Sequence, residues 1–130
     1  MMLFTLLSLL VALSSSTPAP AEPQVTSTLT LTSTLATALT LSSSSCTGCV
    51  FLSSPASSIA PGSTVKTRFE LLPGFSLGTA KVGYGGAKGE TAGVVVTQYE
   101  VGTTPTVKSE CKPTACACTA GAARNTTCTI

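Results

Sequence analysis

Cysteine is the side chain in this sequence best able to do chemistry. The 130-residue chain contains 6 Cys and no His, so it has sulfur but lacks the commonest general base and metal ligand. The cysteines fall into a pair and a C-terminal group: Cys46 and Cys49, then Cys111, Cys116, Cys118 and Cys128. An even number of cysteines in a small secreted chain predicts structural disulfides. We therefore predict six disulfide cysteines, with no catalytic residue, metal ligand or cofactor.

The pairing of these cysteines is not fixed by their spacing. A Cys116–Cys118 bridge would close a very tight ring, and a Cys46–Cys49 bridge would remove little chain entropy because its loop is small. We expect instead that Cys46 and Cys49 pair with the C-terminal group, and that the third bridge forms within that group. Such bridges would close loops of about 65 residues and tie both ends of the β-rich region together.

Two other uses of the cysteines compete with disulfides. Cys46-x2-Cys49 has the spacing of zinc ligands, but oxidation competes with zinc binding in a secreted chain. A redox role for Cys46-Thr47-Gly48-Cys49 would need a thiolate stabilised at a helix N-terminus, and the sequence shows no such helix. Structural disulfides are the interpretation that the composition favours.

The first residues predict a signal peptide. Leu3 to Leu13 is apolar except for Thr5 and Ser8, and it is shorter than the roughly 20 residues that cross a bilayer. Small residues follow through Ala21, as signal peptidase requires, with cleavage expected after Ala19 or Ala21 or near Ser16. We predict a signal peptide over 1–21 and a secreted, extracellular protein. The polar C-terminus predicts no membrane anchor.

The charged residues argue against two classes of function. The net charge is +2 with 9 % charged residues and no Trp, which does not supply the basic, aromatic surface of a nucleic-acid-binding protein. Acid–base chemistry would rest on Glu alone, and a glycosidase needs two opposed carboxylates. Glu70 shares a strand face with Lys66 and Arg68, and Glu90 lies in a Gly-rich turn. These are surface charges, and we predict that the protein is not an enzyme.

Three smaller patterns have simple interpretations. The run Gly83 to Gly89 lacks the spacing of a phosphate-binding loop and predicts a hairpin turn. Tyr84 and Tyr99 could stack on sugars, but ordinary core or interface roles are favoured. Asn125-Thr126-Thr127 is an acceptor for N-glycosylation, which predicts a glycan on Asn125 at the surface.

The segment 22–45 is rich in Thr and Ser and has two interpretations. Its hydroxyls could carry O-linked sugars on an extended stretch. Alternatively, Thr occupies the even positions from Thr26 to Thr34 while Leu29, Leu31 and Leu35 occupy odd positions, which predicts an edge strand within 25–41. Ser42 to Ser45 would then be a loop.

The region 46–130 predicts a single disulfide-stabilised β domain with an irregular Cys-rich end after Cys111. Thr64 to Leu72 alternates cleanly, with further strands centred on 80–84 and over 94–101, and a short one over 106–108. Pro61-Gly62 and Pro73-Gly74 mark turns. Short strands separated by turns predict an all-β fold, a small antiparallel, immunoglobulin-like β-sandwich.

One resemblance adds to this picture. The run Ile59-Ala60-Pro61-Gly62-Ser63-Thr64-Val65, followed by Val82-Gly83-Tyr84-Gly85, resembles the necrosis-inducing secreted protein family of fungal effectors. In that family a Pro-Gly-Ser/Thr turn opens an immunoglobulin-like domain. The resemblance implies a secreted fungal effector that engages host immune-receptor kinases, although the six cysteines depart from the family pattern. It assigns no functional residue.

The expected function is therefore that of a secreted, non-enzymatic interaction protein, specifically an apoplastic effector that acts by surface contact. The alternative is a glycosylated structural or adhesive component of the cell wall, and a small hydrolase or protease inhibitor comes third. The expected partner is an extracellular protein or a cell-wall polysaccharide, with no nucleic acid.

Overall fold

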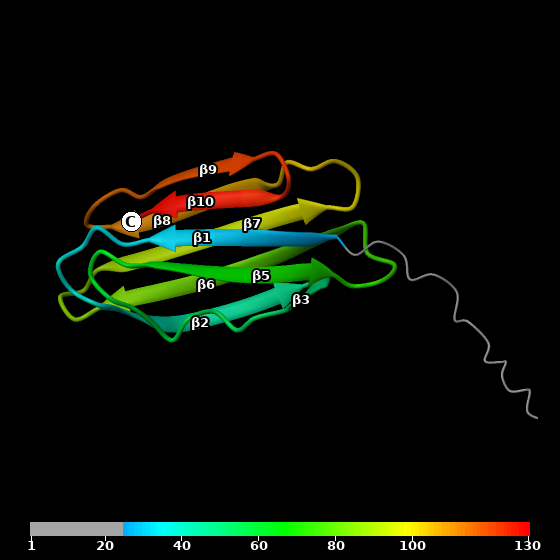
Figure 1. Cartoon of the computed structure of the whole chain (residues 1–130). Helices are drawn as coiled ribbons and strands as arrows, with labels where there is room; N and C mark the ends of the chain where they lie inside the picture. The colour runs from blue at the N-terminus through cyan, green and yellow to red at the C-terminus, as the bar shows by residue number, and fades with distance from the viewer. Residues whose placement is uncertain (1–24) are drawn as a thin grey trace, which may run out of the picture.

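The computed structural model describes residues 25–130, and these form two β-sheets packed face to face (Figure 1). The strands are β1 (Thr26–Thr32), β2 (Leu39–Thr47), β3 (Cys49–Phe51), β4 (Ser58–Ile59), β5 (Thr64–Leu71), β6 (Leu77–Gly86), β7 (Thr91–Tyr99), β8 (Thr106–Lys112), β9 (Ala117–Gly121) and β10 (Asn125–Thr129). The predicted all-β sandwich is confirmed. The predicted signal peptide lies outside the described residues.

Each sheet has five strands. Sheet A has the order β3-β5-β1-β10-β9, and sheet B has the order β4-β2-β6-β7-β8. Sheet B is antiparallel throughout, whereas sheet A is mixed because β1 and β10 run parallel, with Thr28 beside Asn125 and Leu31 beside Cys128. The expectation of a wholly antiparallel sandwich was wrong at this pair. A parallel pair joins strands distant in sequence, so no local turn signal announces it.

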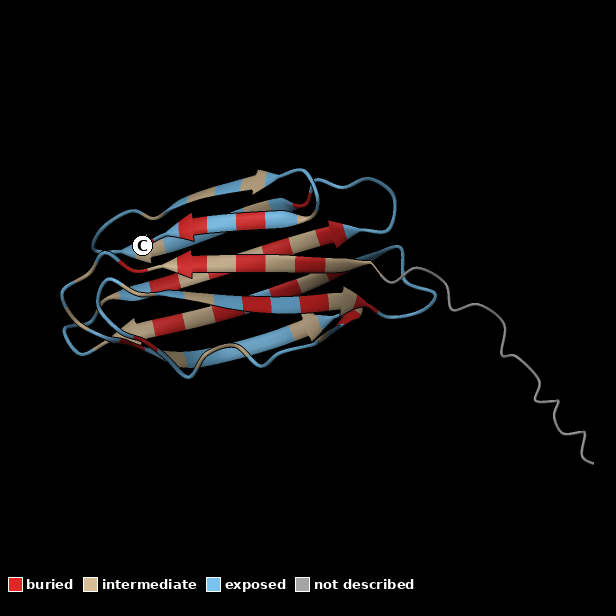
Figure 2. Cartoon of the chain, in the orientation of Figure 1, coloured by how far each residue is buried: buried red, intermediate tan, exposed pale blue. Residues whose placement is uncertain are grey.

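Alternation along the strands accounts for which side chains form the core. In β5, Thr67, Phe69 and Leu71 are buried while Lys66 and Arg68 are exposed, as the alternation in the sequence predicted. Along β1, buried and partly buried residues alternate in the same way (Figure 2). Successive strand side chains point to opposite faces, so the strands at the centre of the sandwich, such as β1, β5, β6 and β7, turn one buried face toward the other sheet.

The core between the sheets is mainly aliphatic but contains hydroxyl and amide side chains. Its largest fully buried apolar residues are Phe69, Leu29, Leu31, Leu39, Ile59, Val94 and Val96. Ser27, Ser33, Thr67, Gln98 and Thr126 are buried with them. Ser27 Oγ donates to the carbonyl of Arg124 at 3.1 Å, and Gln98 Nε2 donates to the carbonyl of Tyr99 at 3.0 Å. These bonds replace partners that water would supply to Ser27 and Gln98, whereas the buried Thr67 and Thr126 hydroxyl groups have no hydrogen-bond partner among the described residues.

Several predicted boundaries need correction. The Thr/Ser-rich segment supplies β1 at the centre of sheet A, not at an edge, so the domain begins well before residue 46. Ser42 to Ser45 lies within β2 rather than in a loop, because Ser43, Ser44 and Ser45 pair with β6 and Ser42 lies at an irregularity in that pairing. The C-terminal region is regular too: β8 extends to Lys112, and β9 and β10 form a hairpin.

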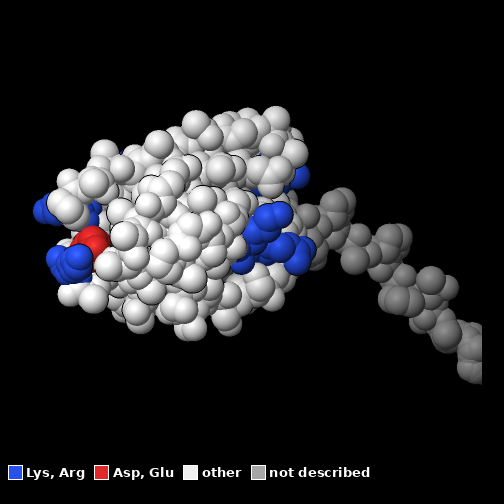
Figure 3. All heavy atoms as spheres, turned by 60° about the vertical axis from the view of Figure 1, so that its left-hand side comes forward, with Lys and Arg blue, Asp and Glu red and all other residues white. Residues whose placement is uncertain are grey.

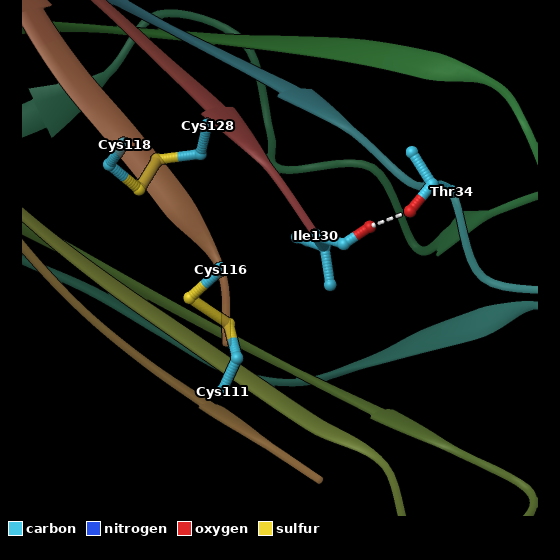
Figure 4. The surroundings of a disulfide bond; sticks show 6 residues. All are labelled: Thr34, Cys111, Cys116, Cys118, Cys128 and Ile130. Atoms are coloured by element: carbon cyan, nitrogen blue, oxygen red, sulfur yellow. Dashed lines mark hydrogen bonds between the residues drawn. A yellow bond between two sulfur atoms is a disulfide. The ribbon is translucent and has the colours of Figure 1, made fainter. Parts of the chain in front are cut away.

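All six cysteines form disulfides: Cys46–Cys49, Cys111–Cys116 and Cys118–Cys128. The first joins β2 of sheet B to β3 of sheet A, and the second joins β8 of sheet B to the segment entering β9 of sheet A. Cys118 and Cys128 lie directly opposite each other on β9 and β10, with Cα atoms 4.0 Å apart (Figure 4). The disulfides therefore tie the two sheets together on opposite sides of the sandwich and fasten its C-terminal hairpin.

The expected pairing between Cys46, Cys49 and the C-terminal group was wrong. Each bridge is local, with sequence separations of 3, 5 and 10 residues. The reason is geometric: two of the bridges sit where the chain crosses between sheets, and these crossings bring the Cα atoms within 5.2 and 5.5 Å. Gly48, with φ of 71°, permits the sharp reversal between Cys46 and Cys49.

Candidate interaction surface

The fold uses all six cysteines for disulfides. Each of the six cysteine sulfurs is bonded to another sulfur, so the thiolates required for zinc or dithiol redox chemistry are already committed. Within residues 25–130, no cluster of His, Cys, Asp or Glu could hold a metal ion. In the same range no helix is long and apolar enough to cross a membrane.

The four described glutamates occupy separate parts of the fold. Glu70 faces outward from β5, Glu110 lies on β8 of the other sheet, and Glu100 lies in the loop after β7. Glu90 lies between β6 and β7, where its Oε2 accepts a hydrogen bond from the Thr37 hydroxyl at 2.7 Å. That bond, with the backbone N–H of Lys88 donating to Oε1 at 2.9 Å, holds the pKa of Glu90 below its usual value. Glu90 thus fastens two neighbouring loops.

The two tyrosines do not form a shared platform. Tyr84 is buried, and its hydroxyl donates to the carbonyl of Ala56 at 2.7 Å. Burial raises the pKa of Tyr84 because it disfavours the charged phenolate. Tyr99 is exposed at the end of β7. The predicted core role is confirmed for Tyr84, and the predicted hairpin turn joins β6 to β7 after Gly86.

Asn125, the predicted glycosylation site, is exposed at the start of β10. Thr127, two residues on, is also exposed, while Thr126 between them is buried. The Asn125 side chain therefore lies on the outer face of sheet A, where a glycan would project into solvent. Glycosylation of this residue stays a prediction.

One end of the sandwich carries a surface that sequence analysis did not single out. All exposed large apolar side chains of residues 25–130 lie at this end or on the adjoining edge strand: Val50, Leu52, Leu72, Phe75, Leu77, Tyr99 and Val101. We call Leu72, Phe75, Leu77, Tyr99 and Val101 the apolar end. Val101 is 85 % exposed and Phe75 is 48 % exposed. Exposed large apolar side chains that gather at one end of a molecule mark a candidate interaction site.

Hydrogen bonds hold the loops of the apolar end beside one another. Leu77 and Tyr99 are directly opposite on β6 and β7. The N–H of Leu72 donates to the carbonyl of Gly48 at 3.0 Å, and the N–H of Glu100 donates to the carbonyl of Ser76 at 2.8 Å. The Phe75 ring also lies against Gly48, where a Cβ atom would come within 2.9 Å of it. The exposed side chains therefore stand on a braced frame next to the Cys46–Cys49 disulfide.

The opposite end, which we call the polar end, comprises the turns 33–38, 60–63, 87–90 and 113–116. Its side chains bind its own loops: besides Thr37 and Glu90, Thr34 Oγ1 donates to the carbonyl of Ile130 at 2.7 Å (Figure 4). Charged side chains gather in separate places on the surface, with a broad uncharged expanse between them (Figure 3). The molecule thus presents one apolar end and one polar, internally bonded end.

Comparison with known proteins does not identify a family for this chain, so only the structure defines its class. No protein-family model matches the chain, and a search of curated proteins gives no significant match. The fold defines a small all-β protein stabilised by three disulfides.

Proposed function

We propose that this protein is a secreted, non-enzymatic interaction protein that acts outside the cell by surface contact. The observation that carries the proposal is the apolar end. Its five large side chains leave apolar area exposed to water at a cost in solvation free energy, and none of them is among the buried residues of the core. A partner with an apolar pocket would recover that free energy. The three disulfides are consistent with the oxidising compartment that secretion implies.

The partner we propose for the apolar end is an extracellular protein. Phe75 and Tyr99 are the aromatic anchors that protein interfaces favour, and Glu100 adds a charged rim between Tyr99 and Val101. A partner with a concave apolar pocket and a basic rim would complement this surface. In its specific form the proposal is an apoplastic effector of fungal origin, for which the resemblance of 59–65 and 82–85 to necrosis-inducing secreted proteins is the sequence support.

The test is site-specific photocrosslinking of the purified, oxidised protein in apoplastic fluid. A photoreactive phenylalanine replaces Phe75, and a matched probe replaces Thr64, which is exposed toward the polar end. We expect a discrete protein adduct from position 75 that unlabelled protein suppresses, and no such adduct from position 64. Identical adducts from both positions, or none from position 75, would contradict the proposal.

The alternative is a glycosylated component of the cell wall. The feature that favours it is the row of Thr28, Thr30 and Thr32, whose side chains lie on the outer face of β1 and are partly accessible. Fractionation of the producing organism separates the two functions. Free protein in the medium with little sugar favours the effector, and tight retention in the wall with glycans on 26–45 favours the wall component.

A further inference from the structure

A second surface, separate from the apolar end, crosses the outer face of sheet B. It is an open groove of about 480 Å³ that spans β2, β6, β7 and β8. Strand pairing arranges its outward residues in two rows. One row contains Lys81, Val95 and Lys108, and the other contains Ser43, Gly83, Gly93 and Glu110. The floor is therefore Val95 and two bare glycines, with longer side chains along its borders.

The longer side chains give the groove a definite charge pattern. Lys81 and Lys108 lie on either side of Val95, two strand spacings or about 10 Å apart. Both lysines are exposed, so their ammonium groups can reach a ligand lying across the strands. Glu110 and Ser43 lie at opposite ends of the neighbouring row and can accept or donate hydrogen bonds. A long ligand with carboxylates and hydroxyl groups matches this pattern.

Packing requires a glycine at one of the two floor positions but not at the other. A Cβ at Gly83 would meet Ser43 Oγ at 2.7 Å, so the irregular pairing of β2 with β6 explains that residue. At Gly93 the nearest atom to an added Cβ is the carbonyl oxygen of Glu110, at an ordinary 3.7 Å. Gly weakens a strand interior, and nothing in the packing requires it here. A glycine in such a place fits a site where a ligand approaches the sheet closely.

We propose that this groove binds a linear acidic polysaccharide. A peptide would gain little on the face of the sheet, because the N–H and C=O groups of β7 are already paired with those of β6 and β8. A sugar chain needs no free backbone groups. Its ring faces pack on Val95 and Gly93, its hydroxyl groups bond to Ser43 and Glu110, and its carboxylates pair with Lys81 and Lys108.

The proposal is tested by titrating the purified, oxidised protein with polygalacturonate. Fully methyl-esterified polygalacturonate is the neutral control, and polyglutamate tests whether charge alone suffices. We expect binding of polygalacturonate and weak or no binding of the other two polymers. Equal binding of the esterified polymer or of polyglutamate, or no binding of polygalacturonate, would overturn the proposal.

Variants locate the site. Gly93→Val fills the floor, and Gly121→Val is its control, because an added Cβ at Gly121 in β9 also meets its nearest atom at 3.7 Å. Lys81→Gln and Lys108→Gln each remove one cation, and Lys66→Gln does so on the other sheet. We expect each lysine variant of the groove to weaken binding about tenfold, as loss of one charge-assisted contact does, and Gly93→Val to weaken it because its side chain blocks the floor. Both controls should bind like the original protein, and thermal unfolding confirms that each variant folds. Equal weakening by Lys66→Gln would assign binding to diffuse charge, and equal weakening by Gly121→Val would show that the floor of the groove is not the site; either result refutes the groove.

Discussion

The two ends of the sandwich use their side chains in opposite ways. At the polar end, Thr34, Thr37 and Glu90 bind neighbouring loops of the same chain. At the apolar end the loops are held by backbone hydrogen bonds, while side chains such as Phe75 and Val101 face solvent. The backbone hydrogen bonds of the apolar end do not involve its side chains, so much of the surface of those side chains stays open to solvent. We therefore expect a partner to bind at the apolar end rather than at the polar end.

The strongest way to sharpen this comparison is to truncate two phenylalanines that differ in burial. Phe69→Ala should lower the free energy of unfolding by about 3–5 kcal/mol, because Phe69 is fully buried and its removal leaves a cavity. Phe75→Ala should lower it by only about 1 kcal/mol, because the Phe75 side chain is 48 % exposed and its buried part packs near the surface against Gly48. Urea unfolding of both variants measures the difference. A large loss from Phe75→Ala would show that the apolar end serves stability.

Removing one disulfide from each end tests whether each disulfide supports only its own end of the sandwich. Replacing Cys46 and Cys49 together by Ala should lower the free energy of unfolding by about 1.5 kcal/mol, and replacing Cys111 and Cys116 by about 2 kcal/mol, because both loops are short. Only the first pair braces the apolar end, so only that variant should also weaken adducts from position 75. Loss of crosslinking in both variants would break the distinction between the ends.

The hydrogen bond from the Tyr84 hydroxyl to the carbonyl of Ala56 joins β6 to the loop that contains Ala56, and a substitution of Tyr84 tests its contribution to stability. Tyr84→Phe should lower the free energy of unfolding by about 1 kcal/mol at neutral pH, through loss of that hydrogen bond. Burial raises the pKa of Tyr84 above the 10.0 of an exposed tyrosine. Above about pH 10 the unfolded chain loses this proton before the folded one does, so stability falls as pH rises. In the variant this part of the alkaline loss should vanish, as unfolding between pH 9 and pH 11 would measure.

The smallest expected effect concerns Glu90 at the polar end. Its pKa is lowered in the folded state, so its contribution to stability is present above the unfolded value of 4.5 and is lost as pH falls through the folded pKa. Glu90→Gln should therefore reduce the acid-induced fall in the urea midpoint between pH 5 and pH 3. Thr37→Val, which removes the leading cause of the lowered pKa, should act in the same direction. An unchanged acid profile in both variants would mean that the bonds of Glu90 do not stabilise the polar end.

The sequence by itself determined the strands whose side chains alternate. Thr64 to Leu71 and Thr26 to Thr32 carry apolar and polar residues with a period of two, and that period specifies a strand with one buried face. The cysteine content likewise predicted a domain held by disulfides. These properties are readable because they depend on residue type and on spacing over a few positions.

Ser42 to Ser45 shows where local reading failed. The four serines show no apolar alternation, yet they form part of β2 because β6 supplies partners for Ser43, Ser44 and Ser45 next to one irregular position at Ser42. Within residues 25–130, only Leu39 and Thr40 of β2 pair with β4. The serines that follow are exposed, so these positions need no apolar side chain. Only the tertiary structure could reveal this, since the partner strand lies about 40 residues away in the sequence.

The two proposed binding surfaces and the disulfide pairing were also decided by tertiary structure alone. Phe75 and Val101 come from different loops, and Lys81 and Lys108 come from different strands, so no sequence window contains either surface. The cysteine pairing depends on where the chain crosses from one sheet to the other, and the spacing of the cysteines in the sequence does not show where that happens. Residue types and their period determined which segments are strands. The packing of two sheets decided which side chains meet, because contact depends on register and chain path rather than on sequence distance.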